Sequence, residues 1–184
     1  MRKIIFSINS TINGGADHTS GIVDDELHNF YTDYLDNIDV VLMGRKTYEL
    51  MEGYWPVAHE DPQITISTLR FADKFNSVPK IIFTNTLKEV KWQNSRIAEK
   101  DLIETVSDLK NGKGKYISAG SLSIASQLLN KNMIDEFWFL IHPIIGKKGT
   151  QLFEEINEKR NLKLLETKIF NSGVIVMHYQ KKEN

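Results

Sequence analysis

The sequence contains no cysteine among its 184 residues. This absence excludes disulfides, thiolate metal ligands, iron–sulfur clusters and a cysteine nucleophile. It agrees with a reducing compartment, and the first residues show no apolar signal-peptide segment, so we expect a cytoplasmic protein. Proline is scarce, with four residues, and no Pro- or Ser-rich linker or internal repeat divides the chain. We therefore predict a single domain over residues 1–184.

An excess of one charge and long apolar runs are also lacking. The 23 basic and 24 acidic residues leave a net charge of −1, whereas nucleic-acid binding depends on a basic surface. No stretch reaches the roughly 18 apolar residues that span a bilayer. We expect a small-molecule substrate and a second copy of the chain, in a homodimer, as the partners, and neither a nucleic acid nor a membrane.

Common metal and catalytic motifs are missing. The histidines, which are His18, His28, His59, His142 and His178, show no pairing at helical or strand spacing, so we expect no metal site. His142 falls in an apolar strand pattern and is expected to be a hydrogen-bonded core residue. Neither the G-x-S-x-G elbow of serine hydrolases nor the G-x-G-x-x-G dinucleotide motif occurs.

What is present is an alternation of short apolar runs with helical periods. Leu27, Phe30, Tyr31, Tyr34 and Leu35, for example, recur at the spacing of one helix face. This order predicts an α/β fold with a mainly parallel sheet and antiparallel C-terminal strands. The predicted strands are 3–9, 39–43, 79–83, 115–119, 135–142, 162–170 and 173–181. The predicted helices are 25–35, 46–52, 101–110 and 121–131. The segment 53–77 shows no clear pattern.

Two strand-to-helix junctions could bind an anion. Gly44-Arg45-Lys46-Thr47 and Gly120-Ser121-Leu122 each place a helix N-terminus at the carboxyl end of a predicted parallel strand. Two such junctions at one sheet edge suit a ligand with several phosphates. The alternative is a pair of ordinary tight turns. Thr84-Asn85-Thr86 follows the third strand and offers hydroxyl and amide groups to a ribose or phosphate, although these residues also form turns.

Carboxylates precede the first predicted helix at Asp24, Asp25 and Glu26. Asp24 is a plausible N-cap, and the other two fit a first helical turn. Asp25 or Glu26 could instead protonate or orient a substrate nitrogen.

The order of these elements and their residues resembles a known family. It looks like the dihydrofolate reductase-like superfamily, and most closely the C-terminal reductase domain of the bacterial riboflavin-biosynthesis deaminase/reductase and its free-standing relatives. The matching stretches are IIFSINSTINGGAD (4–17), IDVVLMGRKTYELM (38–51), KIIFTNTL (80–87) and YISAGSLSIASQLLNKNMIDEFWFLIHPIIGKKGTQLF (116–153).

The resemblance implies a three-layer α/β/α fold and an NADPH-dependent reductase with activity of the 5-amino-6-(5-phosphoribosylamino)uracil reductase type. It implies that Glu26, with Asp25 next to it, takes the place of the acidic residue of the folate-reducing members. It also assigns cofactor contacts by position. The residues implied to contact the phosphates are Gly44, Arg45, Lys46, Thr47, Gly120, Ser121 and Leu122. Those implied to lie at the adenosine side are Thr84, Asn85 and Thr86, and those implied to border the nicotinamide are Asn9 and Ala16.

The sequence departs from the family pattern in ways that bear on the substrate. Asn13 stands where the family usually has aspartate after the first strand, and Ala119 precedes Gly120 in place of a glycine pair. The tryptophan and proline that precede the acid in folate reducers are missing, which argues against dihydrofolate. We expect hydride transfer to a C=N or C=O carbon of a small heterocycle. The alternatives are a non-catalytic nucleotide- or flavin-binding homodimeric module, and a homodimer whose apolar interface lies at residues 135–145.

Overall fold

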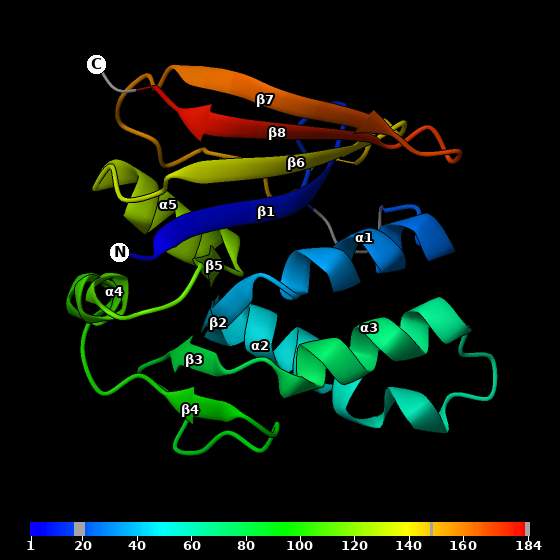
Figure 1. Cartoon of the computed structure of the whole chain (residues 1–184), viewed down its shortest axis with the longest axis horizontal. Helices are drawn as coiled ribbons and strands as arrows, with labels where there is room; N and C mark the ends of the chain where they lie inside the picture. Colours follow the sequence, from blue (N-terminus) through cyan, green and yellow to red (C-terminus); the bar gives the residue numbers. More distant parts are fainter. Residues whose placement is uncertain (17–20, 148, 183–184) are drawn as a thin grey trace.

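The computed structural model describes residues 1–16, 21–147 and 149–182, and its centre is one eight-stranded sheet (Figure 1). The strand order is β4-β3-β2-β5-β1-β6-β8-β7. All neighbours from β4 to β6 are parallel, and β8 and β7 add to this sheet in antiparallel fashion. The bounds are β1 Lys3–Thr11, β2 Ile38–Gly44, β3 Lys80–Phe83, β4 Ser95–Ile97, β5 Tyr116–Ala119, β6 Glu136–His142, β7 Leu162–Ile169 and β8 Ile175–Lys181.

Helices cover both faces of the sheet because neighbouring residues of the buried strands point to opposite sides. Ile4 and Phe6 of β1 pack with α4 and α5, whereas Ile5 packs in the cluster that includes residues of α1, α2 and α3. This arrangement confirms the predicted three-layer α/β/α fold with antiparallel C-terminal strands. The helix bounds are α1 Asp25–Leu35, α2 Arg45–Glu52, α3 Ile66–Ser77, α4 Leu102–Asn111 and α5 Leu122–Asn130.

The segment 53–77, which the sequence left without a pattern, forms a 3-10 helix, η2 (Trp55–Glu60), and the helix α3. Thr65 caps α3 by accepting a hydrogen bond from the N–H of Thr68. The helix packs along α1 through Phe71, whose ring stacks on His28 with 5.7 Å between the centroids. The short strand β4 was also not expected, because three residues carry too little alternation to recognise.

Strand β6 occupies most of residues 135–145, the stretch offered as an alternative dimer interface. It pairs with β1 on one side and with β8 on the other, and Phe137 and Leu140 are buried. The apolar run is therefore an interior strand, which explains its hydrophobicity without a second subunit. In the part of the chain that the structure describes, no helix is long and apolar enough to cross a membrane.

Candidate functional site

The two predicted helix openings meet at the carboxyl edge of the sheet. Strand β2 ends at Gly44, where α2 begins, and the neighbouring β5 leads through Gly120 and Ser121 into α5. The backbone N–H of Gly44 donates a hydrogen bond of 3.0 Å to Oγ of Ser121. Because β2 and β5 pair in parallel, both helix N-termini face the same side of the molecule.

Close packing at this junction explains the two glycines. A Cβ atom on Gly120 would lie 2.5 Å from Cγ1 of Val41 and 3.1 Å from the carbonyl oxygen of Leu42. On Gly44 it would lie 3.0 Å from Oγ of Ser123. The N–H groups of the two glycines are engaged within the chain, by Oγ of Ser121 and by the carbonyl of Leu42. The groups that could bind a phosphate are therefore the N–H groups of the first turns of α2 and α5.

A cleft of about 890 Å³ opens beside this junction. Such a volume lies within the range of small-molecule and cofactor pockets. The structure brings together seven of the predicted cofactor residues on its walls, namely Gly44, Arg45, Lys46, Thr47, Thr84, Asn85 and Thr86. Gly120, Ser121 and Leu122 do not line the cleft, although Ser121 touches Gly44 at its edge.

The sequence did not single out a further wall of the cleft. It consists of the β4–α4 connection, with Lys100 and Asp101, and the exposed face of α5, with Ser123 and Gln127. Asp101 is the N-cap of α4, because it accepts a hydrogen bond from the N–H of Glu104. The capping pattern predicts where the helix begins, but it does not predict that β4 pairs with β3 and so brings this connection to the cleft.

The cations of the cleft differ in their pairing. Arg45 forms an ion pair of 2.8 Å with Glu49, one turn along α2. Hydrogen bonds to Glu104 and Asp108 raise the pKa of Lys100. Lys46 makes no ion pair within residues 1–16, 21–147 and 149–182, so its charge is the most available for a ligand phosphate.

Thr84, Asn85 and Thr86 form the turn after β3. Oγ1 of Thr84 accepts hydrogen bonds of 3.1 Å from the N–H groups of Thr86 and Leu87. Thr84 therefore shapes the turn, and the side chains of Asn85 and Thr86 are exposed at the cleft.

The carboxyl end of β1 is fixed by His142. Nδ1 of His142 accepts a hydrogen bond of 2.9 Å from the N–H of Ile22, so Nε2 carries the proton and donates to Oδ1 of Asn9 at 3.0 Å. Burial lowers the pKa of His142 and favours this neutral form. Ala16 is held by a hydrogen bond from its N–H to the carbonyl of Thr150. His18 lies outside the described residues.

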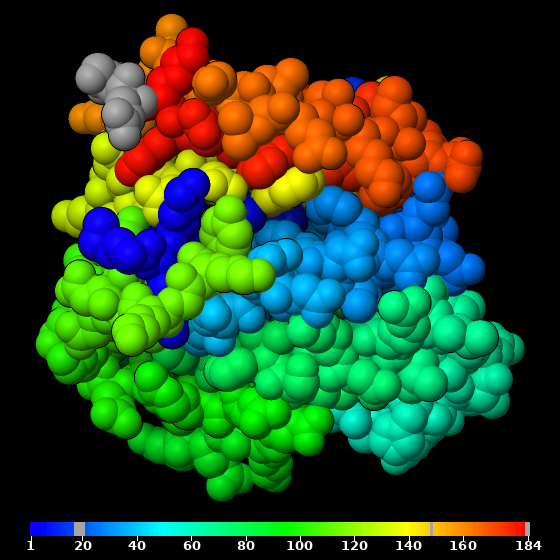
Figure 2. Space-filling view, in the orientation of Figure 1, coloured from blue at the N-terminus to red at the C-terminus, as the bar shows by residue number. Residues whose placement is uncertain are grey.

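The carboxylates of α1 contact other elements and do not line the cleft. Asp25 accepts hydrogen bonds from the hydroxyls of Ser67 and Thr65, which lower its pKa. Glu26 accepts a hydrogen bond of 2.6 Å from the N–H of Asn171, between β7 and β8. Figure 2 shows this hairpin, in orange and red, against the blue surface of α1. Asp24 caps α1 as predicted, whereas a catalytic role of Asp25 or Glu26 stays a prediction.

A buried polar group on α1 was missed by the sequence analysis. Nδ1 of His28 lies 2.9 Å from Oγ1 of Thr68, and its ring packs between Trp55 and Phe71. Burial lowers the pKa of His28. No motif marks this residue, because its partners come from the unassigned segment 53–77. The described residues contain no group of three or more His, Asp or Glu side chains that could hold a metal.

The strand order and paired helix openings define the class of dihydrofolate reductase-like α/β folds. The sequence matches the RibD C-terminal domain family over residues 2–176, and the chain belongs to that family.

Individual relatives agree with this assignment. The Bacillus subtilis protein "Uncharacterized protein YyaP" is 32% identical over 184 residues, which cover 97% of this chain and 94% of the relative. The crystal structure of the "Putative riboflavin biosynthesis protein" from Shewanella is similar, with a TM-score of 0.72 at 18% identity, covering 98% of this chain and 99% of that chain. Dihydrofolate reductase from Enterococcus faecalis, complexed with NADP(H), gives a TM-score of 0.64 at 11% identity, covering 98% and 97%.

Proposed function

We propose that this protein is an NADPH-dependent reductase that transfers hydride to a C=N or C=O carbon of a small heterocycle, of the pterin or ribosylaminopyrimidine kind. The observation that carries the proposal is the contact between Gly44 and Ser121, which places two helix N-termini beside one cleft. The family match supports a reductase-type function. The similar fold of a dihydrofolate reductase complexed with NADP(H) supports a nicotinamide cofactor.

The residues present fit such a cofactor. Within the described residues, no side chain caps the first turns of α2 and α5, so their N–H groups can bind an anion, and the cleft beside them is large enough for a nucleotide. The N-termini of α2 and α5 would bind the diphosphate, with Lys46 adding a positive charge. Asn85 and Thr86 would contact the adenosine side, while Asn9 and Ala16 would border the nicotinamide.

The cofactor supplies the hydride, and the chain supplies position and a dry surface. His142 holds the end of β1 through Asn9 and so fixes the nicotinamide side of the site. We assign proton delivery to the start of α1. Glu26 is the first candidate to relay a proton from solvent, because the resemblance puts it in the place of the family's acid, while hydrogen bonds from Ser67 and Thr65 favour the charged form of Asp25.

Calorimetric titration with NADPH tests the proposal. The unmodified protein should bind NADPH saturably, and Lys46→Gln should bind roughly 10- to 150-fold more weakly, since a charge-assisted hydrogen bond contributes roughly 1.5–3 kcal/mol. Lys91→Gln is the matched control, because Lys91 is exposed and does not line the cleft. Absence of binding at millimolar NADPH would refute the proposal.

One observation favours a second candidate, a nucleotide- or flavin-binding module without catalysis. Both carboxylates at the start of α1 are engaged by distant parts of the chain, as structural residues are. A reduction screen with pterin, aminopyrimidine and quinone substrates separates the two. Turnover that falls in Glu26→Gln supports the reductase, while tight NADPH binding without any turnover supports the binding module.

A further inference from the structure

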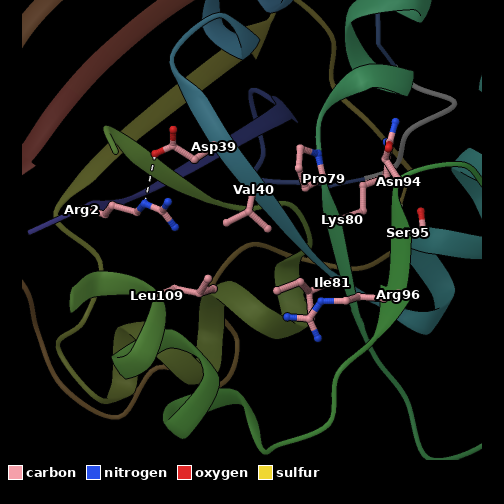
Figure 3. Close-up of a pocket in the computed structure, with 10 residues that line it drawn as sticks. All are labelled: Arg2, Asp39, Val40, Pro79, Lys80, Ile81, Asn94, Ser95, Arg96 and Leu109. Atoms are coloured by element: carbon pink, nitrogen blue, oxygen red, sulfur yellow. Dashed lines mark ion pairs between the residues drawn. The ribbon is translucent and has the colours of Figure 1, made fainter. Parts of the chain in front are cut away.

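A second cavity lies at the opposite edge of the sheet, where the parallel strands begin (Figure 3). It has a volume of about 290 Å³. Its lining comes from the residue before β1, from the first residues of β2, β3 and β4, and from the C-terminal half of α4. None of the residues assigned to the cofactor lines it, so this cavity is separate from the proposed active site.

The cavity combines an apolar floor with two guanidinium groups. Figure 3 shows Val40, Ile81 and Leu109 between Arg2 on one side and Arg96 on the other. The terminal nitrogens of Arg2 are turned toward Val40, and the Arg96 side chain extends from β4 along Ile81. A floor of this kind suits an apolar body, and guanidinium groups suit an oxyanion.

Arg2 is held in place by the chain around it. Its Nε donates a hydrogen bond of 2.8 Å to the carbonyl of Lys113 and lies 3.3 Å from Oδ2 of Asp39. A Cβ on Gly114, whose φ is +143°, would collide with Nε of Arg2, and one on Gly112 would lie 3.6 Å from its Cζ. The turn therefore wraps the inner edge of the guanidinium. Within the described part of the chain, its two terminal nitrogens form no hydrogen bond.

The charge of the cavity is left unbalanced. Asp39 is the one acidic residue among the lining residues, and it is already engaged by Arg2 and by the N–H of Lys115 at 2.6 Å. Arg96 is exposed and makes no ion pair with any residue that the structure describes. The Arg96 guanidinium thus lies at the cavity without a counter-charge.

We propose that this cavity binds a small organic oxyanion, a carboxylate or phosphate carried on an apolar body. The anion contacts the terminal nitrogens of Arg2 and the guanidinium of Arg96, and the apolar body packs against the half-buried Leu109 at the cavity floor, beneath which Val40 and Ile81 are buried. The proposal does not depend on the reductase activity.

The test is a titration of the full-length protein followed by amide chemical shifts, with benzoate, phenyl phosphate and neutral benzamide as probes. We expect saturable shifts at Val40, Ile81 and Leu109 with benzoate or phenyl phosphate, and none with benzamide. The amides of Gly44 and Gly120 should not shift. Arg96→Gln should weaken binding about tenfold, and Arg70→Gln, which removes an exposed arginine of α3, should not.

The proposal is overturned if neither anion gives saturable shifts at millimolar concentration. Binding of benzamide as strong as that of benzoate would also overturn it, because the arginines would then play no part. Equal affinity of Arg96→Gln and the unmodified protein for benzoate would overturn the proposal as well, because Arg96 would then not contact the anion. The spectrum of each variant reports whether it is folded, so a loss of binding is not confused with unfolding.

Discussion

The ammonium group of Lys80 lies 4.2 Å from the centre of the Trp92 ring, inside the core. Lys80 is 1% exposed, and Nζ donates a hydrogen bond of 2.8 Å to the carbonyl of Val78. Carbonyl oxygens and aromatic faces attract the cation, but burial lowers the pKa of Lys80 to about 8. Lysine occurs here at the first position of β3, where the strand leaves the C-terminal end of α3.

This pKa predicts an unusual pH dependence. The folded state loses the Lys80 proton near pH 8, whereas the unfolded chain keeps it to about 10.5. Between these values the unfolded state binds more protons, so the free energy of unfolding should rise with pH. Guanidinium chloride unfolding at pH 7.5 and at pH 9.5, conditions chosen on that basis, measures the rise. Lys80→Met should remove the rise, and Lys91→Met should keep it; an unchanged rise in Lys80→Met would assign it to another group.

Gly120 tests the packing of the glycine junction. Gly120→Ala should destabilise the protein by about 1–3 kcal/mol, because the new methyl group collides with Val41 and the Leu42 carbonyl. Gly53→Ala is the matched control, since its Cβ would make ordinary contacts of 3.7 Å with Glu49 and Leu50. Thermal unfolding of both variants checks the prediction, and equal melting temperatures would contradict it.

His142 couples the end of β1 to the loop before α1. His142→Leu should cost about 1–3 kcal/mol, because it leaves the N–H of Ile22 and the amide of Asn9 without their partner. NADPH affinity should fall with it if Asn9 borders the nicotinamide. The exposed His59 provides the control variant His59→Leu. An unchanged stability in His142→Leu would show that water replaces the ring without loss.

The same residue predicts sensitivity to acid. Burial holds the pKa of His142 below its ordinary value of 6.5, so the unfolded chain takes up this proton first as the pH falls. Stability that is present above pH 6.5 should therefore decrease below it. His28 acts in the same direction. The decrease, measured by urea unfolding in buffers on both sides of that pH, should be smaller in His142→Leu than in His59→Leu.

An exposed edge of the sheet offers a surface for the expected homodimer. Strand β7 is one of the two edge strands of the sheet, and Leu164 and Leu165 on it are 49% and 43% exposed. Edge strands present unpaired backbone groups to a second chain. We predict a dimer in sedimentation equilibrium, and a shift toward monomer in Leu164→Lys. The control is Val57→Lys, at an exposed position of η2, which should leave the dimer intact. If the unmodified protein is a monomer, the prediction is wrong.

The sequence predicted the elements that carry strong local patterns. Apolar runs such as Ile38–Gly44 are buried between two other strands, and burial on both faces requires them to be continuously hydrophobic. The glycines at 44 and 120 could be located because both end a strand and begin a helix. They were expected at the same edge of the sheet because the carboxyl ends of parallel strands lie on one side.

The partners of the site residues could not be predicted in the same way. Glu26 meets the N–H of Asn171, which is 145 positions away, and Asp25 meets Thr65 and Ser67, about 40 positions away. No local spacing encodes such contacts, because they depend on strand order and on the packing of α3 along α1. Lys100 could not be predicted as a cleft residue either, because its position depends on the pairing of the short strand β4 with β3.

The central position of β1 governs when this chain can fold. Lys3 lies beside Tyr116, and Phe6 lies between Ala119 and Phe137. After β1 has been synthesised, more than a hundred further residues must therefore follow before either of its neighbours exists. Contacts so distant in sequence slow folding, and a nascent chain holding only β1 to β4 exposes an apolar strand. Chaperone contact during synthesis is the physiological consequence to look for in this protein.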